Sequence, residues 1–509
     1  MKYPDINFLR DIFLFDENEP LLFTRLYFWG FLAVTLAIYS IIYKQKALRN
    51  TYLFLISIFF YYKSSGLFFL LLIFTTFTDF FLGLGIYNSH KKIWKKILVA
   101  LSITVNLGVL SYFKYTYFFT ETFNQIAGTD VEVINWLAVW FNNASGSHFD
   151  TSRIFLPVGV SFFTFQAISY TVDVYRGKCQ AVKNIIDFGF YISFFPQLVA
   201  GPIVRASEFV PQLYQKYALT REEFGYALYM IMKGLFKKMV LGDYIAVNFI
   251  DRVFDNPTIY SGFENLTALY GYSLQVYCDF SGYTDIAIGV ALLLGFRLPR
   301  NFNSPYKAEN VGDFWKRWHM SLSSWLKDYL YIPIGGNRYG KLRTNINLMI
   351  TMLLGGLWHG ANLKFIIWGG LNGIGLIIYK LWKKISPYEK RKHILVHAWK
   401  IFLTFNFITF TRIWFRADDM ERINGMLYQL SHNLDFTVAP QVVMSYKLVF
   451  ILMIFGFITH WWPSKWKDNY MNWFIRIPHW VKVIIVAVLV SIIYLSQTSE
   501  LQPFIYFQF

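Results

Sequence analysis

Long apolar segments recur along the whole chain and are separated by short polar stretches. A helix that crosses a membrane needs about 20 mostly apolar residues, because the hydrocarbon layer is about 30 Å thick and a helix rises about 1.5 Å per residue. Leu21–Tyr43 meets this length with one charged residue, Arg25. Further apolar segments are Tyr52–Tyr62, Leu67–Tyr87, Ile97–Phe119, Ile154–Tyr175, Ile185–Val204, Tyr226–Ile250, Leu266–Phe296, Asn345–Trp358, Phe365–Trp382, Ile401–Phe415, Leu448–Trp462 and Val481–Leu495. Several are too short to cross alone, so we expect about ten to twelve transmembrane helices plus re-entrant or interfacial helices.

The same pattern indicates the fold class. Repeated alternation of apolar and polar residues, which is typical of strands, does not recur along the chain. Low-complexity linkers and stretches with the composition of a soluble domain are not apparent either. We therefore expect an all-α polytopic membrane protein that forms one integral membrane domain over residues 1–509.

Composition agrees with this class. Of the 509 residues, 55% are hydrophobic and 16% are charged, whereas about a quarter of the residues in soluble domains are charged. So much apolar surface argues against a soluble enzyme, and it argues equally against a disordered chain. Cys179 and Cys278 are the only cysteines, so the sequence predicts no disulfide framework and no metal site rich in cysteine. We expect no bound metal.

The net charge of +17 would suggest a nucleic-acid partner in a soluble protein. Here the basic residues cluster between apolar segments, at Lys44–Arg49, Lys91–Lys96 and Arg176–Lys183. Acidic residues precede the first segment (Asp11, Asp16, Glu17 and Glu19) and recur between residues 121 and 150. If Tyr52–Tyr62 and Leu67–Tyr87 cross as a pair, the basic and acidic groups alternate sides consistently. Because loops rich in Lys and Arg face the cytoplasm, this distribution then predicts an N-terminus outside the cell. It assigns the charge to membrane orientation and to attraction of an anionic donor substrate. Membrane lipid is an expected partner, and nucleic acid is not. The N-terminal residues lack a basic region and a cleavage site, so we expect no removable signal peptide.

Two carboxylates interrupt a long apolar run near the middle of the chain. Asp279 and Asp285 lie beside or within Leu266–Phe296, where an ionised group is costly unless it faces a partner or a polar cavity. Six helical steps separate the two residues by about 120° around the axis, so they need not share one site. They either brace helix packing as hydrogen-bond acceptors or line a pathway.

An amphipathic segment follows at residues 313–329. Its aromatic and leucine residues recur at helical spacing along one side, whereas Lys316 and Arg317 lie on the other side. Asp313 suits the N-cap of this helix. The segment is too charged to cross lipid, so we expect it to lie in the interface or to dip into the protein. His319, within it, is either a hydrogen-bonded interfacial histidine or part of a site.

A second histidine, His359, ends an apolar run and is followed closely by Asn362. Gly355, Gly356 and Gly360 allow the backbone to approach closely around the imidazole. A buried ionisable group at this depth is a functional candidate, and a packed neutral histidine is the alternative.

The catalytic motifs that this sequence lacks narrow the kinds of reaction that it can catalyse. The chain contains no G-x-S-x-G nucleophile elbow, no H-E-x-x-H zinc helix and no Walker loop. A neutral imidazole is a competent general base near pH 7. A buried histidine without a protein nucleophile therefore fits direct acyl transfer, in which an incoming hydroxyl attacks an activated acyl carbon. A second histidine, an asparagine or a backbone N–H can stabilise the developing oxyanion.

Longer motifs give a specific resemblance. W-K-R-W-H-M-S-L-S-S-W-L-K-D-Y-L-Y-I-P-I-G-G-N-R (Trp315–Arg338) is followed by L-L-G-G-L-W-H-G-A-N (Leu353–Asn362). Both resemble the membrane-bound O-acyltransferase family, closest to the membrane subunit of bacterial alginate and polysaccharide O-acetyltransferases. Further stretches agree, namely Leu156–Gln166, Phe194–Arg205, Phe280–Asp285 and Ile413–Ala417.

The resemblance implies catalytic roles for His359, in W-H-G-A, and for His319, in R-W-H-M-S. It implies a helical ring with a tunnel that contains His359, and Trp318, Lys316 and Arg317 near the tunnel mouth. Snorkelling of both charges to the interface is the alternative. Asn362, Asp279 and Asp285 are further candidates for binding substrate or lining the tunnel.

The same resemblance implies the reaction and its participants. Acetyl-CoA would be the donor substrate, with no tightly bound cofactor, and hydroxyls of a cell-surface polysaccharide would be the acceptor. An extracytoplasmic acetyltransferase of the SGNH type would be the partner, at the bacterial cytoplasmic (inner) membrane. Teichoic-acid D-alanyl transferases share the R-W-H-M-S-L-S wording and are the nearest family alternative. A transporter that uses the histidines as a proton relay is a further alternative.

Overall fold

Helices form the regular structure of the protein. The computed structural model describes residues 13–16, 19–199, 201–389 and 393–496, and no strand occurs among them. The predicted all-α class is confirmed. Contacts divide the described chain into two compact units. Unit 1 comprises the described part of residues 1–199 with 203–216 and 360–362, and unit 2 comprises 201–202, 217–359 and the described residues from 363 onward. The expectation of a single domain stays a prediction.

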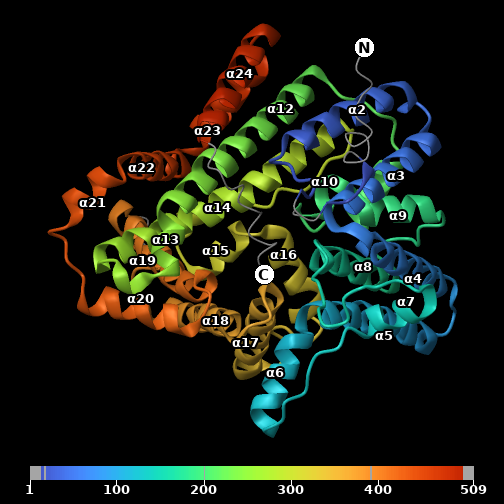
Figure 1. Cartoon of the computed structure of the whole chain (residues 1–509), viewed down its shortest axis with the longest axis horizontal. Coiled ribbons are helices and arrows are strands. Elements are labelled where there is room, and N and C mark those ends of the chain that lie inside the picture. The colour runs from blue at the N-terminus through green and yellow to red at the C-terminus, as the bar shows by residue number, and fades with distance from the viewer. Residues whose placement is uncertain (1–12, 17–18, 200, 390–392, 497–509) are drawn as a thin grey trace. The chain divides into compact units, whose positions relative to one another are not determined.

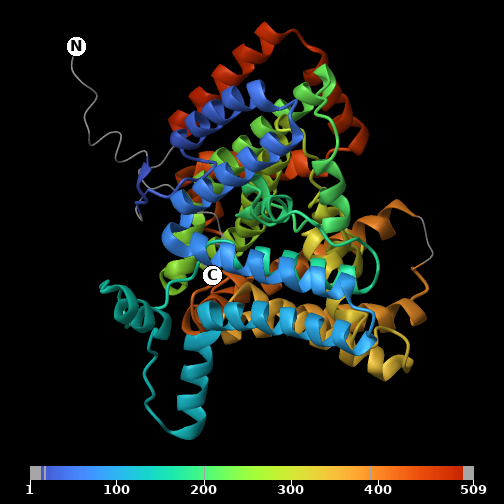
Figure 2. The ribbon, with the colours of Figure 1, turned by 90° about the vertical axis from the view of Figure 1, so that its right-hand side faces the viewer.

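Unit 1 consists mainly of apolar helices. They are α2 (Leu26–Ile42), α3 (Lys46–Ser65), η1 (Gly66–Phe68), α4 (Phe69–Asn88), α5 (Lys92–Leu110), η2 (Ser111–Tyr115), α6 (Thr116–Ala127), α7 (Trp136–Ser145), α8 (Val160–Tyr175), α9 (Ile185–Ser193), α10 (Phe195–Leu198) and α11 (Ala206–Leu213). α4 and α5 lie side by side (Figure 2), and the largely buried α8 packs against both. Polar groups join the three helices, because the amide of Asn106 donates to Asp79 at 2.7 Å and Ser102 contacts Thr171 at 2.9 Å.

Unit 2 carries the remaining helices. They are α12 (Arg221–Leu235), η3 (Phe236–Asp243), η4 (Ala246–Ile250), α13 (Asp251–Asp255), η5 (Pro257–Ile259), α14 (Gly262–Leu293), η6 (Pro305–Lys307), α15 (Val311–Arg317), α16 (Met320–Trp325), η7 (Leu326–Tyr331), α17 (Gly340–His359), α18 (Leu363–Ile385), α19 (Ile394–Arg416), α20 (Met420–His432), α21 (Ala439–Ser445), α22 (Lys447–Trp461), α23 (Ser464–Arg476) and α24 (His479–Ser496). Its longest helix, α14, begins at a capping box formed by Ser261 and Glu264.

α12 and α14 lie side by side (Figure 1) and approach closely through glycines. A Cβ atom at Gly282 would lie 2.8 Å from the carbonyl oxygen of Gly234, so a larger residue does not fit there without movement. Small residues allow helix backbones to pack at this distance. α14 is consequently buried along most of its length, and it forms the centre of unit 2.

Within the described residues, six helical segments are long and apolar enough to cross a membrane. They are Lys46–Asn88, Lys92–Ala127, Gly262–Leu293, Leu363–Ile385, Ile394–Arg416 and His479–Ser496. Ala439–Ser445 and Lys447–Trp461 are bent by 93° and would make a seventh span if counted together. By length and composition alone, the described residues thus account for six or seven of the expected ten to twelve spans, and several other predicted apolar segments form short or interrupted helices.

The segment at 313–329 differs from its prediction as one helix. The backbone leaves the helix at Trp318, which is extended, and at His319, which has a positive φ of 43°. This break separates α15 from α16, and η7 follows as a π-helix. The predicted N-cap was also wrong. The cap is Asn310, whose side chain accepts a hydrogen bond from the Asp313 backbone N–H at 2.8 Å.

Candidate active site

The last turn of α17 places His359 in the interior of unit 2. α17 packs against α18 at glycines, since a Cβ atom at Gly356 would lie 2.2 Å from the carbonyl oxygen of Phe365. A Cβ atom at Gly369 would likewise lie 2.3 Å from the carbonyl oxygen of Met352. The small residues therefore let the two helices meet backbone to backbone. His359 is 3% exposed.

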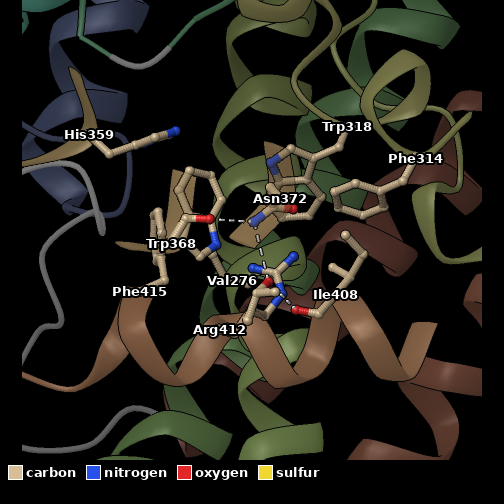
Figure 3. Close-up of a pocket in the computed structure, with 10 residues that line it drawn as sticks. Val276, Phe314, Trp318, His359, Trp368, Asn372, Ile408, Arg412 and Phe415 are labelled. Atoms are coloured by element: carbon tan, nitrogen blue, oxygen red, sulfur yellow. Dashed lines mark hydrogen bonds between the residues drawn. The ribbon is translucent and has the colours of Figure 1, made fainter. Parts of the chain in front are cut away.

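A small pocket opens beside His359 (Figure 3). Its lining residues come from α14, α15, α17, α18, α19 and the break before α16, and they are Val276, Phe314, Trp318, His359, Trp368, Asn372, Ile408, Thr411, Arg412 and Phe415. The lining is mostly aromatic and aliphatic, with a few polar groups. This composition is typical of a site that orients a small substrate.

Three aromatic rings surround the imidazole of His359. The ring of Trp368 lies edge to face with it, with centroids 5.1 Å apart and an interplanar angle of 89°. The rings of Trp358 and Phe415 follow at 5.0 and 5.2 Å. Because these rings come from α17, α18 and α19, the packing of all three helices sets the orientation of the imidazole.

His319 also packs against Trp358. Its ring centroid is 6.1 Å from that of Trp358 and 4.6 Å from that of Phe280. Its Nδ1 lies 3.3 Å from Oδ1 of Asn301, and the same oxygen accepts hydrogen bonds from the backbone N–H and the hydroxyl of Ser321. Asn301 thus fixes the histidine and the start of α16 together. Burial lowers the pKa of His319, which lies outside the candidate membrane-spanning helices, to about 3.

Two polar residues of the pocket are joined across α18 and α19. Nδ2 of Asn372 donates to the carbonyl oxygen of Trp368 at 2.9 Å and to the hydroxyl oxygen of Thr411 at 3.4 Å. The Thr411 hydroxyl donates in turn to the carbonyl oxygen of Ile408 at 2.9 Å. Among the described residues, Oδ1 of Asn372 has no hydrogen-bond donor, although it is buried. This oxygen can therefore accept a hydrogen bond from a ligand that enters the pocket.

Arg412 supplies the charge of the pocket. The residue is 4% exposed, and its guanidinium carbon lies 4.5 Å from the ring centroid of Trp318 and 5.8 Å from that of Tyr306. One hydrogen bond runs from Nη2 to the hydroxyl of Tyr306 at 3.0 Å. The Arg412 guanidinium is a cation, so it places a positive charge beside this pocket.

The structure brings some of the predicted site residues together and leaves others apart. His359 and Trp318 line the same pocket, and His319 is joined to His359 through Trp358. Lys316 is exposed on α15, and Arg317 pairs with Asp313 at 2.9 Å. Asn362 is exposed in the turn between α17 and α18 and is not among the residues that line the pocket.

Asp279 and Asp285 also lie outside this lining and pair with lysines. Asp285 contacts Lys237 at 2.9 Å and Lys233 at 3.1 Å. Asp279 accepts a hydrogen bond from Lys238, which also contacts Asp243 at 2.7 Å. These ion pairs join α12 and η3 to α14, and the arrangement favours the bracing interpretation over a pathway.

Sequence reasoning missed Arg412, Asn372 and Trp368. A signal for Arg412 was present, because an arginine within an apolar helix is as costly as a buried histidine and is a functional candidate by the same rule. Asn372 and Trp368 gave no comparable signal, because their role depends on how α18 packs against α17 and α19. Among the described residues, no group of three or more His, Cys, Asp and Glu side chains is placed to hold a metal ion.

Comparison with known proteins decides the family. Residues 181–416, which include both histidines and Arg412, match the family model described as "MBOAT, membrane-bound O-acyltransferase family". The "Peptidoglycan O-acetyltransferase" of Helicobacter pylori is 33% identical over 96% of this chain and 97% of its own length. The chain belongs to the membrane-bound O-acyltransferase family. The resemblance predicted from the motifs is therefore confirmed.

Other members of this O-acyltransferase family match over shorter stretches. A "Probable alginate O-acetylase AlgI" of Pseudomonas syringae pv. tomato is 36% identical over 80% of this chain and 74% of its own length. The "Teichoic acid D-alanyltransferase" of Bacillus subtilis is 32% identical over 50% of this chain and 67% of its own length. The O-acyltransferase is thus similar to the two relatives named above for O-acetyl transfer over more of its length (96% and 80%) than to this relative named for D-alanyl transfer (50%).

Proposed function

We propose that this chain transfers an acetyl group from acetyl-CoA toward hydroxyls of a cell-surface polysaccharide, with His359 as general base. The observation that carries the proposal is the position of His359 in a small, mostly apolar pocket within the segment that matches the family. A narrow aromatic pocket suits a two-carbon acyl group better than a long chain.

The proposed chemistry is a direct displacement at a thioester. Nε2 or Nδ1 of His359 takes the proton of an incoming hydroxyl, and the hydroxyl oxygen attacks the carbonyl carbon of the acetyl thioester. The new C–O bond forms, the C–S bond breaks, and the proton passes from His359 to the departing thiolate. The ring contacts with Trp368 and Phe415 support this role, because they hold the base in one orientation.

His319 is proposed as the second catalytic histidine. Its lowered pKa keeps the imidazole neutral at physiological pH, so it acts as a hydrogen-bonding group and not as a fixed charge. Trp318 lines the pocket and borders the acyl group. Lys316 and Arg317 are proposed to help form the cytoplasmic mouth. Asn362 is proposed to bind substrate or to line the tunnel, whereas Asp279 and Asp285 are proposed to brace α14.

The acceptor and partner are proposed from the relatives. The relative with nearly full coverage is named for peptidoglycan, and others are named for alginate, so a surface polysaccharide is the acceptor class that their names support. We propose the bacterial cytoplasmic membrane as the location, with the N-terminus outside and an extracytoplasmic SGNH-type acetyltransferase as the partner.

The test uses inverted membrane vesicles that contain the full chain, supplied with acetyl-CoA labelled in the acetyl group. We expect label on the surface polymer that depends on this chain. Transport of an unmodified solute without labelled polymer would contradict the proposal in favour of a transporter. Label from D-alanine in place of acetate would favour the D-alanyl alternative.

A further inference from the structure

Two arginines lie one helical turn apart on α19 and have opposite surroundings. Arg416 contacts Asp251 at 2.8 Å, Asp418 at 3.6 Å and Asp255 at 3.7 Å. Arg412 is the more deeply buried of the two, yet among the described residues no carboxylate lies within ion-pair distance of it. A buried cation without a counter-ion costs several kcal/mol, and such residues in membrane proteins have functional roles.

Aromatic rings hold the Arg412 guanidinium in place. The face of Trp318 is 4.5 Å from the guanidinium carbon, and the Tyr306 hydroxyl accepts a hydrogen bond from Nη2. Ring quadrupoles attract a cation but carry no net charge. The positive potential of Arg412 is therefore not cancelled in the pocket, as it would be by a carboxylate. Nε of Arg412 also has no hydrogen-bond acceptor among the described residues.

This charge borders the same pocket as His359. Figure 3 shows Arg412 extending from α19 toward Asn372, with Trp318 beyond it and His359 at the opposite side of the pocket. Because both side chains line this pocket, a substrate that spans it contacts His359 at one side and the guanidinium at the other. The surrounding aromatic side chains lower the local dielectric, which strengthens the field of the charge.

We propose that Arg412 is a catalytic residue whose charge stabilises the anion formed during acyl transfer, an inference that rests on the proposed function. Attack of the hydroxyl oxygen on the thioester carbonyl converts a neutral C=O bond into an oxyanion. When that oxyanion collapses, the C–S bond breaks and the charge moves to the sulfur, which takes the proton from His359. Arg412 donates an N–H to the anion and neutralises it before the proton arrives.

A structural role is the competing explanation. Arg412 contacts Tyr306, and the Tyr306 hydroxyl donates to the carbonyl oxygen of Ser273 on α14, so the arginine joins α19 to α14. In that case loss of Arg412 would lower stability, and the folded fraction would keep its turnover. Removing the Tyr306 hydroxyl would then lower stability as much as removing the guanidinium.

The experiment measures acetyl transfer by the full chain in membrane vesicles at varied acetyl-CoA, with thermal melting of the same variants. For Arg412→Gln we expect kcat to fall about 100-fold, with KM changed by less than about threefold. Arg412→Lys keeps the charge and should retain at least about tenfold more turnover than Arg412→Gln. Arg416→Gln is the matched control on the same helix, and it should lower the melting temperature while kcat stays within about threefold of wild type.

Tyr306→Phe separates the two explanations, because it breaks the connection to Ser273 and leaves the charge in place. Because the guanidinium loses this acceptor but keeps its charge, we expect kcat to fall by less than about tenfold, against about 100-fold for Arg412→Gln. A folded Arg412→Gln variant with wild-type kcat, or a folded Arg412→Lys variant without turnover, would overturn the inference. If Arg412→Gln does not fold, Arg412→Lys and Tyr306→Phe test the inference. Turnover in both variants supports it, and a folded Arg412→Lys variant without turnover contradicts it. His359→Ala, assayed in parallel, keeps the two claims distinct, because wild-type turnover in that variant contradicts the proposed function itself.

Discussion

The ring of Trp368 lies edge to face with the ring of His359, at a centroid distance of 5.1 Å and an angle of 89°. Trp368 belongs to α18, which meets α17 through Gly356 and Gly369. The contact links the packing of two helices to the orientation of the proposed base. Misplacing a catalytic group by a small distance is costly, so the contact should be visible in turnover.

Replacing Trp368 by leucine should therefore slow the reaction. An aromatic pair contributes about 1 kcal/mol beyond its buried area, so we expect kcat to fall about fivefold with a smaller change in KM. Trp368→Phe retains a ring and should lose less. The matched control is Trp399→Leu at an exposed tryptophan of α19. Equal losses at both positions would contradict a specific role for Trp368. Acetyl transfer in vesicles is the measurement.

Variants of the ion pair between Asp279 and Lys238 test whether the buried carboxylates of α14 brace the fold or line a pathway. Asp279→Leu alone leaves a buried lysine with one carboxylate fewer, and we expect about 3 kcal/mol of lost stability. Lys238 also pairs with Asp243, so the triple variant Asp279→Leu, Lys238→Met and Asp243→Asn removes all three charges and should recover at least half of that loss. Denaturation of the purified chain in detergent measures both effects. A triple variant that is stable but inactive would favour a pathway.

The backbone at His319 has a φ of 43°, a conformation that asparagine adopts readily and β-branched residues do not. We expect His319→Asn to keep the fold, whereas His319→Val should lose about 1–2 kcal/mol. Both should lose acetyl transfer, because neither carries an imidazole. Melting curves distinguish the two variants. Equal stability would show that the positive φ is not retained in the protein.

The buried His319 also makes stability depend on pH. Its pKa is about 3 in the folded chain, against about 6.5 in an unfolded chain. Below about pH 6.5 the unfolded state takes up a proton and the folded state does not, so stability is complete above this pH and falls as the pH drops toward 3. Between pH 7.5 and pH 5 we expect wild type to lose about 2 kcal/mol more than His319→Asn does. An equal loss of stability in wild type and in His319→Asn would contradict the burial of a neutral imidazole at this position.

The sequence predicted the class and part of the site, because both depend on local signals. Apolar runs identify helices, and His359 and His319 stand out as polar residues in aromatic surroundings. The break at His319 could not be predicted, because the helical spacing of Trp315, Trp318, Leu322 and Trp325 continues through it. The backbone turns there because Asn301, distant in sequence, binds the start of α16. Arg412 could have been predicted, because it is a charged residue within an apolar run. The role of Asn372 could not, because it depends on the packing of three helices.

The count of membrane spans illustrates another limit. Tyr226–Ile250 is apolar enough to predict one span, but it forms α12 followed by the π-helices η3 and η4, with lysines directed at Asp279 and Asp285. Ion pairs allow these polar residues to be buried within the protein. Hydropathy along one segment cannot show a partner that lies on another helix.

The most direct test of the account is acetyl transfer by His359→Ala in vesicles, with membrane insertion and thermal melting measured on the same preparation. His148→Ala, at an exposed histidine of unit 1, is the matched control. We predict that His359→Ala inserts and folds like wild type and transfers no acetyl group to the polymer, while His148→Ala retains full transfer. Wild-type transfer by folded His359→Ala would contradict the central claim.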